Sequence, residues 1–78
     1  MIMEELLNNR IYVSLTDREK EVLTGVCDAL TYKEIGELLF ISTRTVEHHM
    51  YRIFIKIDCN NKIEVVKYAI KNELYKLC

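Results

Sequence analysis

Residues 15–67 read LTDREKEVLTGVCDALTYKEIGELLFISTRTVEHHMYRIFIKIDCNNKIEVVK and contain four signals for the start of a helix. At three of them an oxygen-bearing side chain precedes a Glu by three positions. This is the spacing of a capping box, in which each residue binds the backbone N–H of the other. The four starts are Thr16 with Glu19, Thr31 with Glu34, Asn61 with Glu64, and Ser42 with Thr45. Four starts in 78 residues predict a compact all-α domain with abrupt turns.

Apolar residues at helical spacing follow each start and give the helices approximate bounds. The predicted helices cover residues 17–29, 32–39, 43–57 and 62–76. Only a short apolar turn, Leu39-Phe40-Ile41-Ser42, separates the second helix from the third. A short helix, a tight turn and a longer helix are typical of the helix-turn-helix, which delivers its second helix into the major groove of DNA.

One stripe of each predicted helix is expected to face the core. From the first helix to the fourth, the expected inward residues are Val22, Leu23, Val26 and Leu30; Ile35, Leu38 and Leu39; Val46, His49 or Met50, Ile53 and Ile57; and Ile63, Val66, Ile70, Leu74 and Leu77. Gly36 interrupts the second helix, where a glycine costs about 1 kcal/mol relative to alanine. A glycine at this position indicates that another helix backbone approaches closely.

The composition fits one small domain in a reducing compartment. No apolar run approaches the roughly 20 residues that a membrane span needs, and the N-terminus has no charged start followed by an apolar stretch, so we expect no membrane segment and no secretory signal. Cys27, Cys59 and Cys78 are odd in number and far apart. This spacing favours a cytoplasmic setting over a disulfide scaffold or a zinc finger.

The charge of the chain is unusual for a nucleic-acid binder. Eleven Lys and Arg against twelve Asp and Glu give a net charge of −1, whereas such proteins are usually basic. The distribution is uneven, because residues 1–30 carry three basic and six acidic groups while residues 31–78 carry eight and six. Positive charge is therefore biased toward the half that holds the predicted recognition helix.

Several motifs together resemble one family. LTDREKEVL at Leu15–Leu23, KEIGELLFISTRTVEHH at Lys33–His49, the IxxKI pattern that ends at Ile57, and the NK pair at Asn61 are similar, in order and spacing, to the LuxR/GerE-type helix-turn-helix. The resemblance implies a four-helix LuxR/GerE-like fold whose third helix enters the major groove and whose fourth helix supports dimerisation. It also implies that these helices form a helix-turn-helix bundle and that the protein is a transcriptional regulator. Residues 1–14 have no clear single period, so we interpret them as an N-terminal arm or linker remnant and residues 15–78 as the helix-turn-helix DNA-binding domain.

The sequence departs from the family pattern at a few positions. Glu47 stands where members often carry Lys or Arg, and a carboxylate there either accepts a hydrogen bond from cytosine N4 or repels phosphate. Ala29 and Asp58-Cys59 stand where members usually have Gly and Gly-Val. Tyr32 replaces a frequent Asn, and Ile55 occupies a usually polar position on the exposed side of the third helix.

The candidate DNA-binding residues lie on and around the third helix. Backbone N–H groups and hydroxyls at its N-terminus suit phosphate, and Lys33 and Lys62 are candidate phosphate clamps at the starts of neighbouring helices. The predicted set is Lys33, Thr43, Arg44, Thr45, Glu47, His48, Tyr51, Arg52, Lys56 and Lys62. A solvated helix face is the alternative interpretation of these charges.

The adjacent pair His48 and His49 is a weak signal for a metal site. Neighbours on a helix point about 100° apart and do not share a face, so we expect His49 in or near the core and His48 facing the groove. We therefore expect no metal site and no cofactor. A catalytic Cys–His arrangement would also need a Gly-rich turn and a third residue that orients the histidine; the sequence offers neither, so we expect no enzyme activity.

The fourth helix carries apolar residues beyond its inward stripe, and an exposed apolar strip is a candidate interface. The predicted dimer interface is Val65, Tyr68, Ala69, Asn72 and Tyr75. We therefore expect a sequence-specific regulator that binds double-stranded DNA as a homodimer. Two alternatives remain open: a protein-interaction module on the same fold that contacts RNA polymerase or another regulator, and a module like region four of sigma factors.

Overall fold

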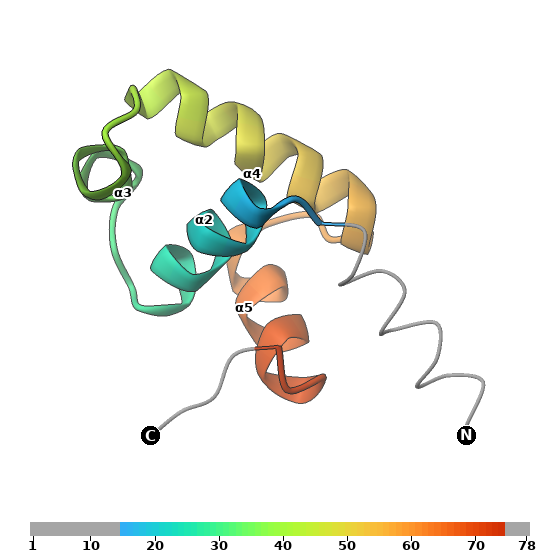
Figure 1. Cartoon of the computed structure of the whole chain (residues 1–78). Helices are drawn as coiled ribbons and strands as arrows, with labels where there is room; N and C mark the ends of the chain where they lie inside the picture. The colour runs from blue at the N-terminus through green and yellow to red at the C-terminus, as the bar shows by residue number, and fades with distance from the viewer. Residues whose placement is uncertain (1–14, 75–78) are drawn as a thin grey trace.

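The computed structural model describes residues 15–74, which form four helices joined by short turns (Figure 1). The helices are α2 (Asp17–Cys27), α3 (Tyr32–Leu39), α4 (Thr43–Ile57) and α5 (Lys62–Lys71). The predicted all-α fold is confirmed, together with the bounds of α3 and α4. Helix α2 ends before its expected end at residue 29, and α5 ends before residue 76. The predicted arm, residues 1–14, lies outside the described residues.

The predicted caps begin all four helices. Thr16 and Thr31 form complete capping boxes with Glu19 and Glu34, respectively. Ser42 Oγ accepts a hydrogen bond from Thr45 N–H at 3.0 Å. At α5, Asn61 Oδ1 accepts from Glu64 N–H at 3.0 Å, while Glu64 Oε1 accepts from the N–H of Asn60, one residue before the cap. These side chains satisfy donors that the first turn of a helix leaves without intrahelical partners.

Each helix ends in the same way, with a residue in the left-handed conformation. These residues are Ala29, Phe40, Asp58 and Glu73, with φ of 66°, 60°, 54° and 57°. In each case the next N–H donates to a carbonyl five residues earlier, as from Leu30 to Gly25 at 3.0 Å. This is the Schellman arrangement, which favours glycine at the left-handed position. The family pattern of glycine at Ala29 and Asp58 is thus explained by backbone geometry.

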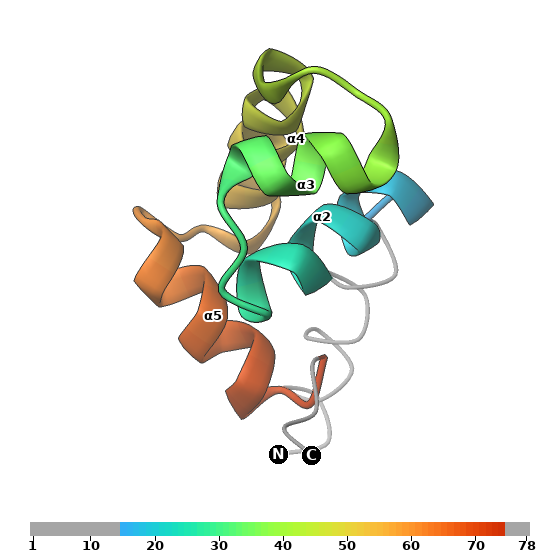
Figure 2. The same cartoon turned by 90° about the vertical axis from the view of Figure 1, so that its left-hand side faces the viewer.

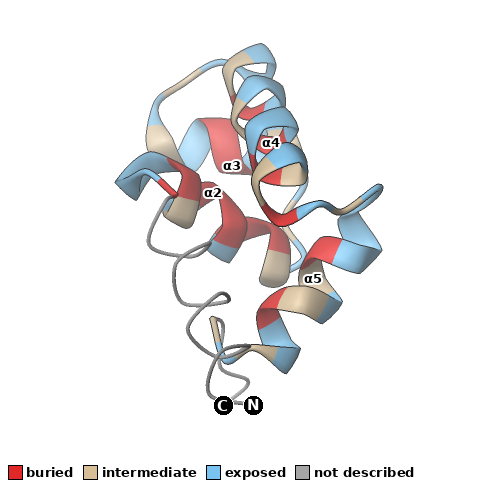
Figure 3. Ribbon diagram, turned by 90° about the vertical axis from the view of Figure 1, so that its right-hand side faces the viewer, coloured by how far each residue is buried: buried red, intermediate tan, exposed pale blue. Residues whose placement is uncertain are grey.

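The core lies where α2, α3 and α4 meet, with α5 packed against α2 below it (Figures 2 and 3). Its buried apolar residues are Leu15, Val22, Leu23, Val26, Ile35, Val46, Met50, Ile53, Ile57, Val65 and Ala69. The expected stripes of α2 and α4 are largely confirmed. Leu38 was expected inside but is 63% exposed, because α3 turns Ile35 and Gly36 toward its neighbours instead.

The inward face predicted for α5 is correct only in part: Val66 and Leu74 are half-buried and pack against the core, and Leu77 lies outside the described residues. Val65 and Ala69 are fully buried, whereas Ile63 and Ile70 are exposed. Helix α5 carries two apolar stripes, and sequence periodicity alone favoured the bulkier one. The stripe with Ala69 faces inward, where its small side chain suits close packing of α5 on α2.

Gly36 fixes the path of the turn between α3 and α4. A Cβ at this position would lie 2.7 Å from the carbonyl oxygen of Ile41, and the N–H of Ile41 donates to the Gly36 carbonyl at 2.9 Å. The close backbone approach predicted from the sequence is confirmed, although the approaching backbone belongs to the turn and not to a second helix.

Candidate DNA interface

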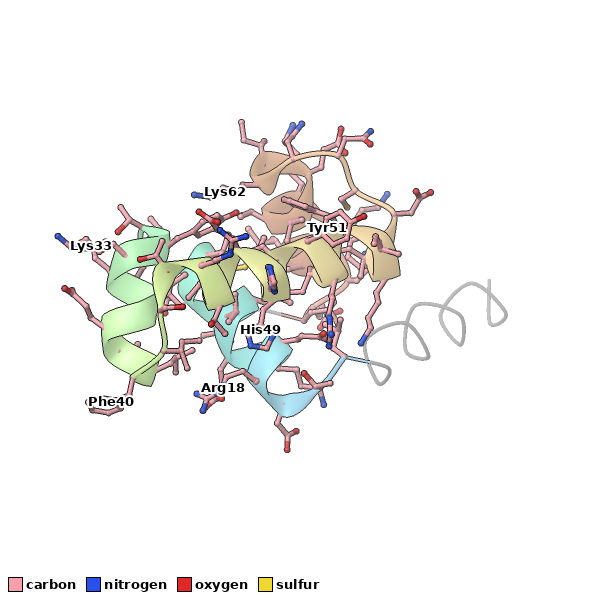
Figure 4. All side chains as sticks on the ribbon, turned by 90° about the horizontal axis from the view of Figure 1, so that it is seen from above. Arg18, Lys33, Phe40, His49, Tyr51 and Lys62 are labelled. Atoms are coloured by element: carbon pink, nitrogen blue, oxygen red, sulfur yellow. The ribbon has the colours of Figure 1, made fainter. Side chains whose placement is uncertain are left out.

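Helix α4 presents one side to solvent along its whole length. We call this side the outer face of α4, and all of its members are exposed: Arg44, Glu47, His48, Tyr51, Arg52 and Ile55. The buried residues of α4 occupy the opposite side of the helix. Figure 4 looks down on the outer face and shows no other helix crossing it. A convex, accessible helix side with two arginines has the shape and donors required to enter a DNA groove.

Two lysines flank the outer face on one side, as Figure 4 shows for Lys33 of α3 and Lys62 of α5. Both are exposed. The Lys62 ammonium lies 4.5 Å from the centre of the Tyr32 ring, a cation–π contact that joins the starts of α3 and α5. Burial, and then the negative charge of Glu47, raise the pKa of Tyr32. The carboxylate of Glu47 on α4 therefore lies close enough to the Tyr32 side chain on α3 to affect its ionisation.

Lys56 was expected to contact DNA, and the structure gives it another partner. Its Nζ lies 2.7 Å from Oε1 of Glu19, whose side chain is fully buried. The same Oε1 accepts from the N–H of Thr16 at 2.9 Å. One carboxylate oxygen thus closes the capping box of α2 and ties α2 to α4. No sequence signal links two residues that are 37 positions apart, so the sequence pattern did not indicate that Lys56 pairs with Glu19.

Glu19 is ionised in this environment despite its burial. Burial raises its pKa, but the hydrogen bonds from Lys56 and Thr16, with the charges of Lys56 and Arg52, outweigh that effect. The net result is a pKa below the ordinary value of the group. Its other oxygen, Oε2, is buried and has no hydrogen-bond partner within the described residues, so the stability of the charge depends on the neighbouring cations.

The N-terminus of α4 combines free and occupied groups. Thr43 and Arg44 are exposed, as predicted for residues near phosphate. Thr45 is half-buried, and its Oγ1 lies 2.9 Å from Ser42 Oγ, so its hydroxyl belongs to the helix cap. Of the two histidines, His48 is exposed and His49 is half-buried on the side toward α2 (Figure 4). Between residues 15 and 74 no group of three His, Cys, Asp or Glu is placed to hold a metal ion.

Two of the five predicted dimer residues lie inside the fold. Val65 and Ala69 belong to the core, and Tyr68 and Asn72 are half-buried; Tyr75 lies outside the described residues. Val65 and Ala69 therefore have no surface that a second copy could contact. Helix α5 instead exposes Ile63 (68%) and Ile70 (38%), with half-buried Val66 between them. We call this set the outer face of α5.

Open grooves lie on both sides of Ile63. One, of about 610 Å³, is lined by Tyr32, Phe54, Asn60, Asn61, Lys62 and Ile63. The other, of about 240 Å³, is lined by Val26, Lys62, Ile63, Val66 and Lys67.

Two cysteines lie within the described part of the chain. Cys27 and Cys59 are half-buried free thiols, and burial raises the pKa of Cys27 to about 11. A thiol with so high a pKa stays protonated and unreactive near neutral pH. In the same stretch, no helix has both the length and the apolar character that crossing a bilayer would require.

Comparison with known proteins agrees with the geometry. The profile of the bacterial regulatory proteins, luxR family (GerE), matches residues 13–69. The chain is 42% identical over 67 residues to a probable transcriptional regulator, ycf29, of Cyanophora paradoxa. The aligned stretch covers 86% of this chain and 32% of the relative. It is 43% identical over 61 residues to the transcriptional regulatory protein LiaR of Bacillus subtilis, covering 78% and 29%.

A third relative is the oxygen regulatory protein NreC of Staphylococcus haemolyticus, 37% identical over 71 residues, or 91% of this chain and 33% of that protein. The chain thus spans about a third of the length of these curated relatives. No solved structure gave a significant match. The family is one of regulators and not of enzymes, its members share a DNA-binding helix-turn-helix, and the family match covers most of the described residues. The chain belongs to the LuxR family of bacterial regulatory proteins.

Proposed function

We propose that the chain binds DNA sequence-specifically and regulates transcription, with α4 in the major groove. The observation that carries this proposal is the outer face of α4, which no other helix covers and on which Arg44 and Arg52 flank His48 and Tyr51. Arginine pairs with guanine or phosphate, and histidine and tyrosine can donate to base edges or phosphate. The family match supports the same assignment.

The proposed contacts divide by position. Thr43 and Arg44 lie at the start of α4 and suit phosphate, as do the flanking lysines Lys33 and Lys62. Glu47 and His48 lie in the first half of α4, the part of a recognition helix that usually reaches the bases, and Tyr51 follows about one turn after Glu47 on the same exposed face. We remove Lys56 from the proposed contacts because its ammonium is held by Glu19, and Thr45 because its hydroxyl completes the cap.

We further propose that the domain dimerises on DNA through the outer face of α5. A single recognition helix reads few base pairs, and two copies about one turn of DNA apart supply the missing specificity. Ile63 and Ile70 are exposed and Val66 between them is half-buried, so α5 leaves part of an apolar surface accessible to a partner. A two-fold contact brings the same patch of both copies together. The free thiols Cys27 and Cys59 support a cytoplasmic location.

A binding titration on a random-sequence DNA pool at two salt concentrations tests the proposal. A DNA binder must lose affinity as salt rises, because each neutralised phosphate releases counterions. The double variant Arg44→Ala/Arg52→Ala should bind much more weakly than wild type and show a shallower salt dependence. Lys71→Ala, an exposed lysine on α5, is the matched control and should behave like wild type. Affinity that does not change with salt would refute the proposal.

A further inference from the structure

The Tyr32 ring bridges the starts of two helices. Tyr32 is the first residue of α3 and Lys62 is the first residue of α5, and the Lys62 ammonium lies 4.5 Å from the centre of the ring. The ring is half-buried and packs against the core, and it lines the groove of about 610 Å³ together with Phe54 and Lys62. The core therefore holds the ring, and the ring in turn can fix the end of the long, exposed Lys62 side chain.

The stability of α5 does not explain a lysine at its start. The first turn of a helix carries the positive end of the helix dipole, which favours acidic residues and disfavours cations. Glu64 in the same turn follows this preference, whereas Lys62 opposes it. The contact with Tyr32 offsets part of that cost, because the negative face of an aromatic ring attracts an ammonium group. The position and the contact together indicate that the charge of Lys62 has a role outside its own helix.

The contact lies beside the outer face of α4. Figure 4 shows Lys62 on the same side of that face as Lys33. Burial, and then the charge of Glu47, raise the pKa of Tyr32, and Glu47 is a member of the outer face. Tyr32 is therefore near both the outer face of α4 and the start of α5. A cation held by Tyr32 lies at the edge of the surface that we propose to enter the groove.

We infer that Tyr32 is a positioning residue, whose ring holds the Lys62 ammonium at the edge of the outer face of α4 for contact with a DNA phosphate. This inference rests on the proposed function, because it assigns Tyr32 a task in DNA binding. A lysine side chain loses much conformational freedom when it is fixed, and fixing it before DNA arrives reduces that loss on binding. The ring takes up one side of the ammonium, and the N–H donors on its other side stay free for phosphate oxygens. Tyr32 itself needs no contact with DNA.

A double-mutant cycle in DNA binding tests the inference. The probe is a DNA duplex that the wild-type chain selects from a random pool, titrated at one fixed salt concentration. Tyr32→Leu removes the ring and keeps apolar bulk, so it should weaken binding about two- to fivefold for each bound copy, the size of one exposed cation–π contact. In the Lys62→Ala background the same substitution should have no further effect. Tyr32→Phe keeps a ring and should bind like wild type, and Tyr32→Met repeats the comparison with a second side chain that lacks a ring.

Arg44→Ala is the matched control, because Arg44 is an exposed cation that we propose to contact phosphate from another helix. Its loss of affinity should add to that of Tyr32→Leu, as expected for sites that share no partner. Thermal unfolding identifies a temperature at which the variants are folded. A second measurement needs no variant: NMR of the free wild-type chain should place the ε-methylene protons of Lys62 upfield of those of Lys67, an exposed lysine of the same helix, because protons over a ring face are shielded.

An equal loss of affinity from Tyr32→Leu with and without Lys62 would overturn the inference, because Tyr32 would then act independently of the lysine. Unchanged or tighter binding by Tyr32→Leu would overturn it as well, and so would Lys62 protons that are not shifted. These results leave the proposed function intact when the wild type binds DNA with the expected salt dependence. A wild type whose DNA affinity does not change with salt would refute the proposed function and this inference together.

Discussion

Lys56 and Glu19, 37 residues apart in the chain, form an ion pair with Nζ and Oε1 2.7 Å apart, and this pair joins the first turn of α2 to the last turn of α4. The carboxylate is fully buried and the lysine is 31% exposed. The pair therefore holds the C-terminal end of α4, whereas Gly36 of α3 packs against the turn that leads into its N-terminal end. It also removes a cation from the surface that the sequence had assigned to DNA.

Removing the lysine should destabilise the fold. Lys56→Ala leaves a buried carboxylate without its ammonium partner, which should lower the free energy of unfolding by about 2–4 kcal/mol. Arg44→Ala, in the exposed first turn of the same helix and not among the charges that act on Glu19, should change it by less than about 0.5 kcal/mol while weakening DNA binding. Urea unfolding of both variants, with DNA titrations under folding conditions, checks the pair. Equal stability of the two variants would show that the ion pair contributes nothing.

The same pair predicts how stability depends on pH. The pKa of Glu19 is lower in the folded chain than its ordinary value of 4.5, so its charge stabilises the fold above that pH and the contribution is lost as pH falls through the folded pKa. Glu19→Gln should therefore be less stable than wild type at neutral pH, and the difference should shrink in the acid range below 4.5. Unfolding free energies of both chains across this range provide the measurement. A difference that stays constant with pH would contradict the assignment.

Glu47 separates two modes of DNA contact. If its carboxylate accepts from cytosine N4, Glu47→Ala should relax base preference at one position by about 1–3 kcal/mol. If it only repels phosphate, Glu47→Lys should tighten binding to all sequences and leave the preference unchanged. Selection from random DNA, followed by titration of the selected sites, distinguishes the two. Identical behaviour of all three chains would place residue 47 away from the DNA.

Dimerisation should depend on Ile63. Ile63→Glu puts a charge on the outer face of α5, where the side chain is 68% exposed, so the monomer should remain folded while cooperative binding to two half-sites is lost. Leu38→Glu, at 63% exposure on α3, is the matched control and should keep that cooperativity. Sedimentation with and without DNA bearing two half-sites measures both. Cooperative binding by the Ile63 variant would place the interface elsewhere.

Ala29 offers a test of the left-handed helix ends. Its φ of 66° is unfavourable for any residue with a Cβ, so Ala29→Gly should raise the free energy of unfolding by about 0.5–1 kcal/mol. The identical substitution at Ala69, a buried position inside α5, should lower it by about 1–2 kcal/mol through lost helix propensity and packing. Chemical denaturation of the two variants should therefore show changes of opposite sign.

Local signals in the sequence predicted the helices well, but they did not predict the contacts between helices that are far apart in the chain. The caps at Thr31 and Ser42 located the starts of α3 and α4, because a cap depends only on residues three positions apart. The inward face of α5 was predicted only in part, because that helix carries two apolar stripes. The packing of α5 against α2 decides that Ala69, and not Ile63, is buried.

The candidate site divides in the same way. The exposure of Arg44, His48 and Arg52 followed from the helical period of α4. The ion pair of Lys56 with Glu19 could not be predicted, because Glu19 lies on another helix. The exposure of the Phe40 side chain could not be predicted either. A short apolar turn has the same sequence pattern whether its side chains point into the core or into solvent.

Gly36 has a consequence for how such a domain changes over time. The turn from α3 to α4 is set by backbone against backbone, with no side chain between Gly36 and the Ile41 carbonyl. The residues on the outer face of α4 take no part in that contact. Substitutions among these residues can change the base preference proposed for α4 without changing the orientation of α4 relative to α3. Base preference and helix orientation can therefore evolve independently.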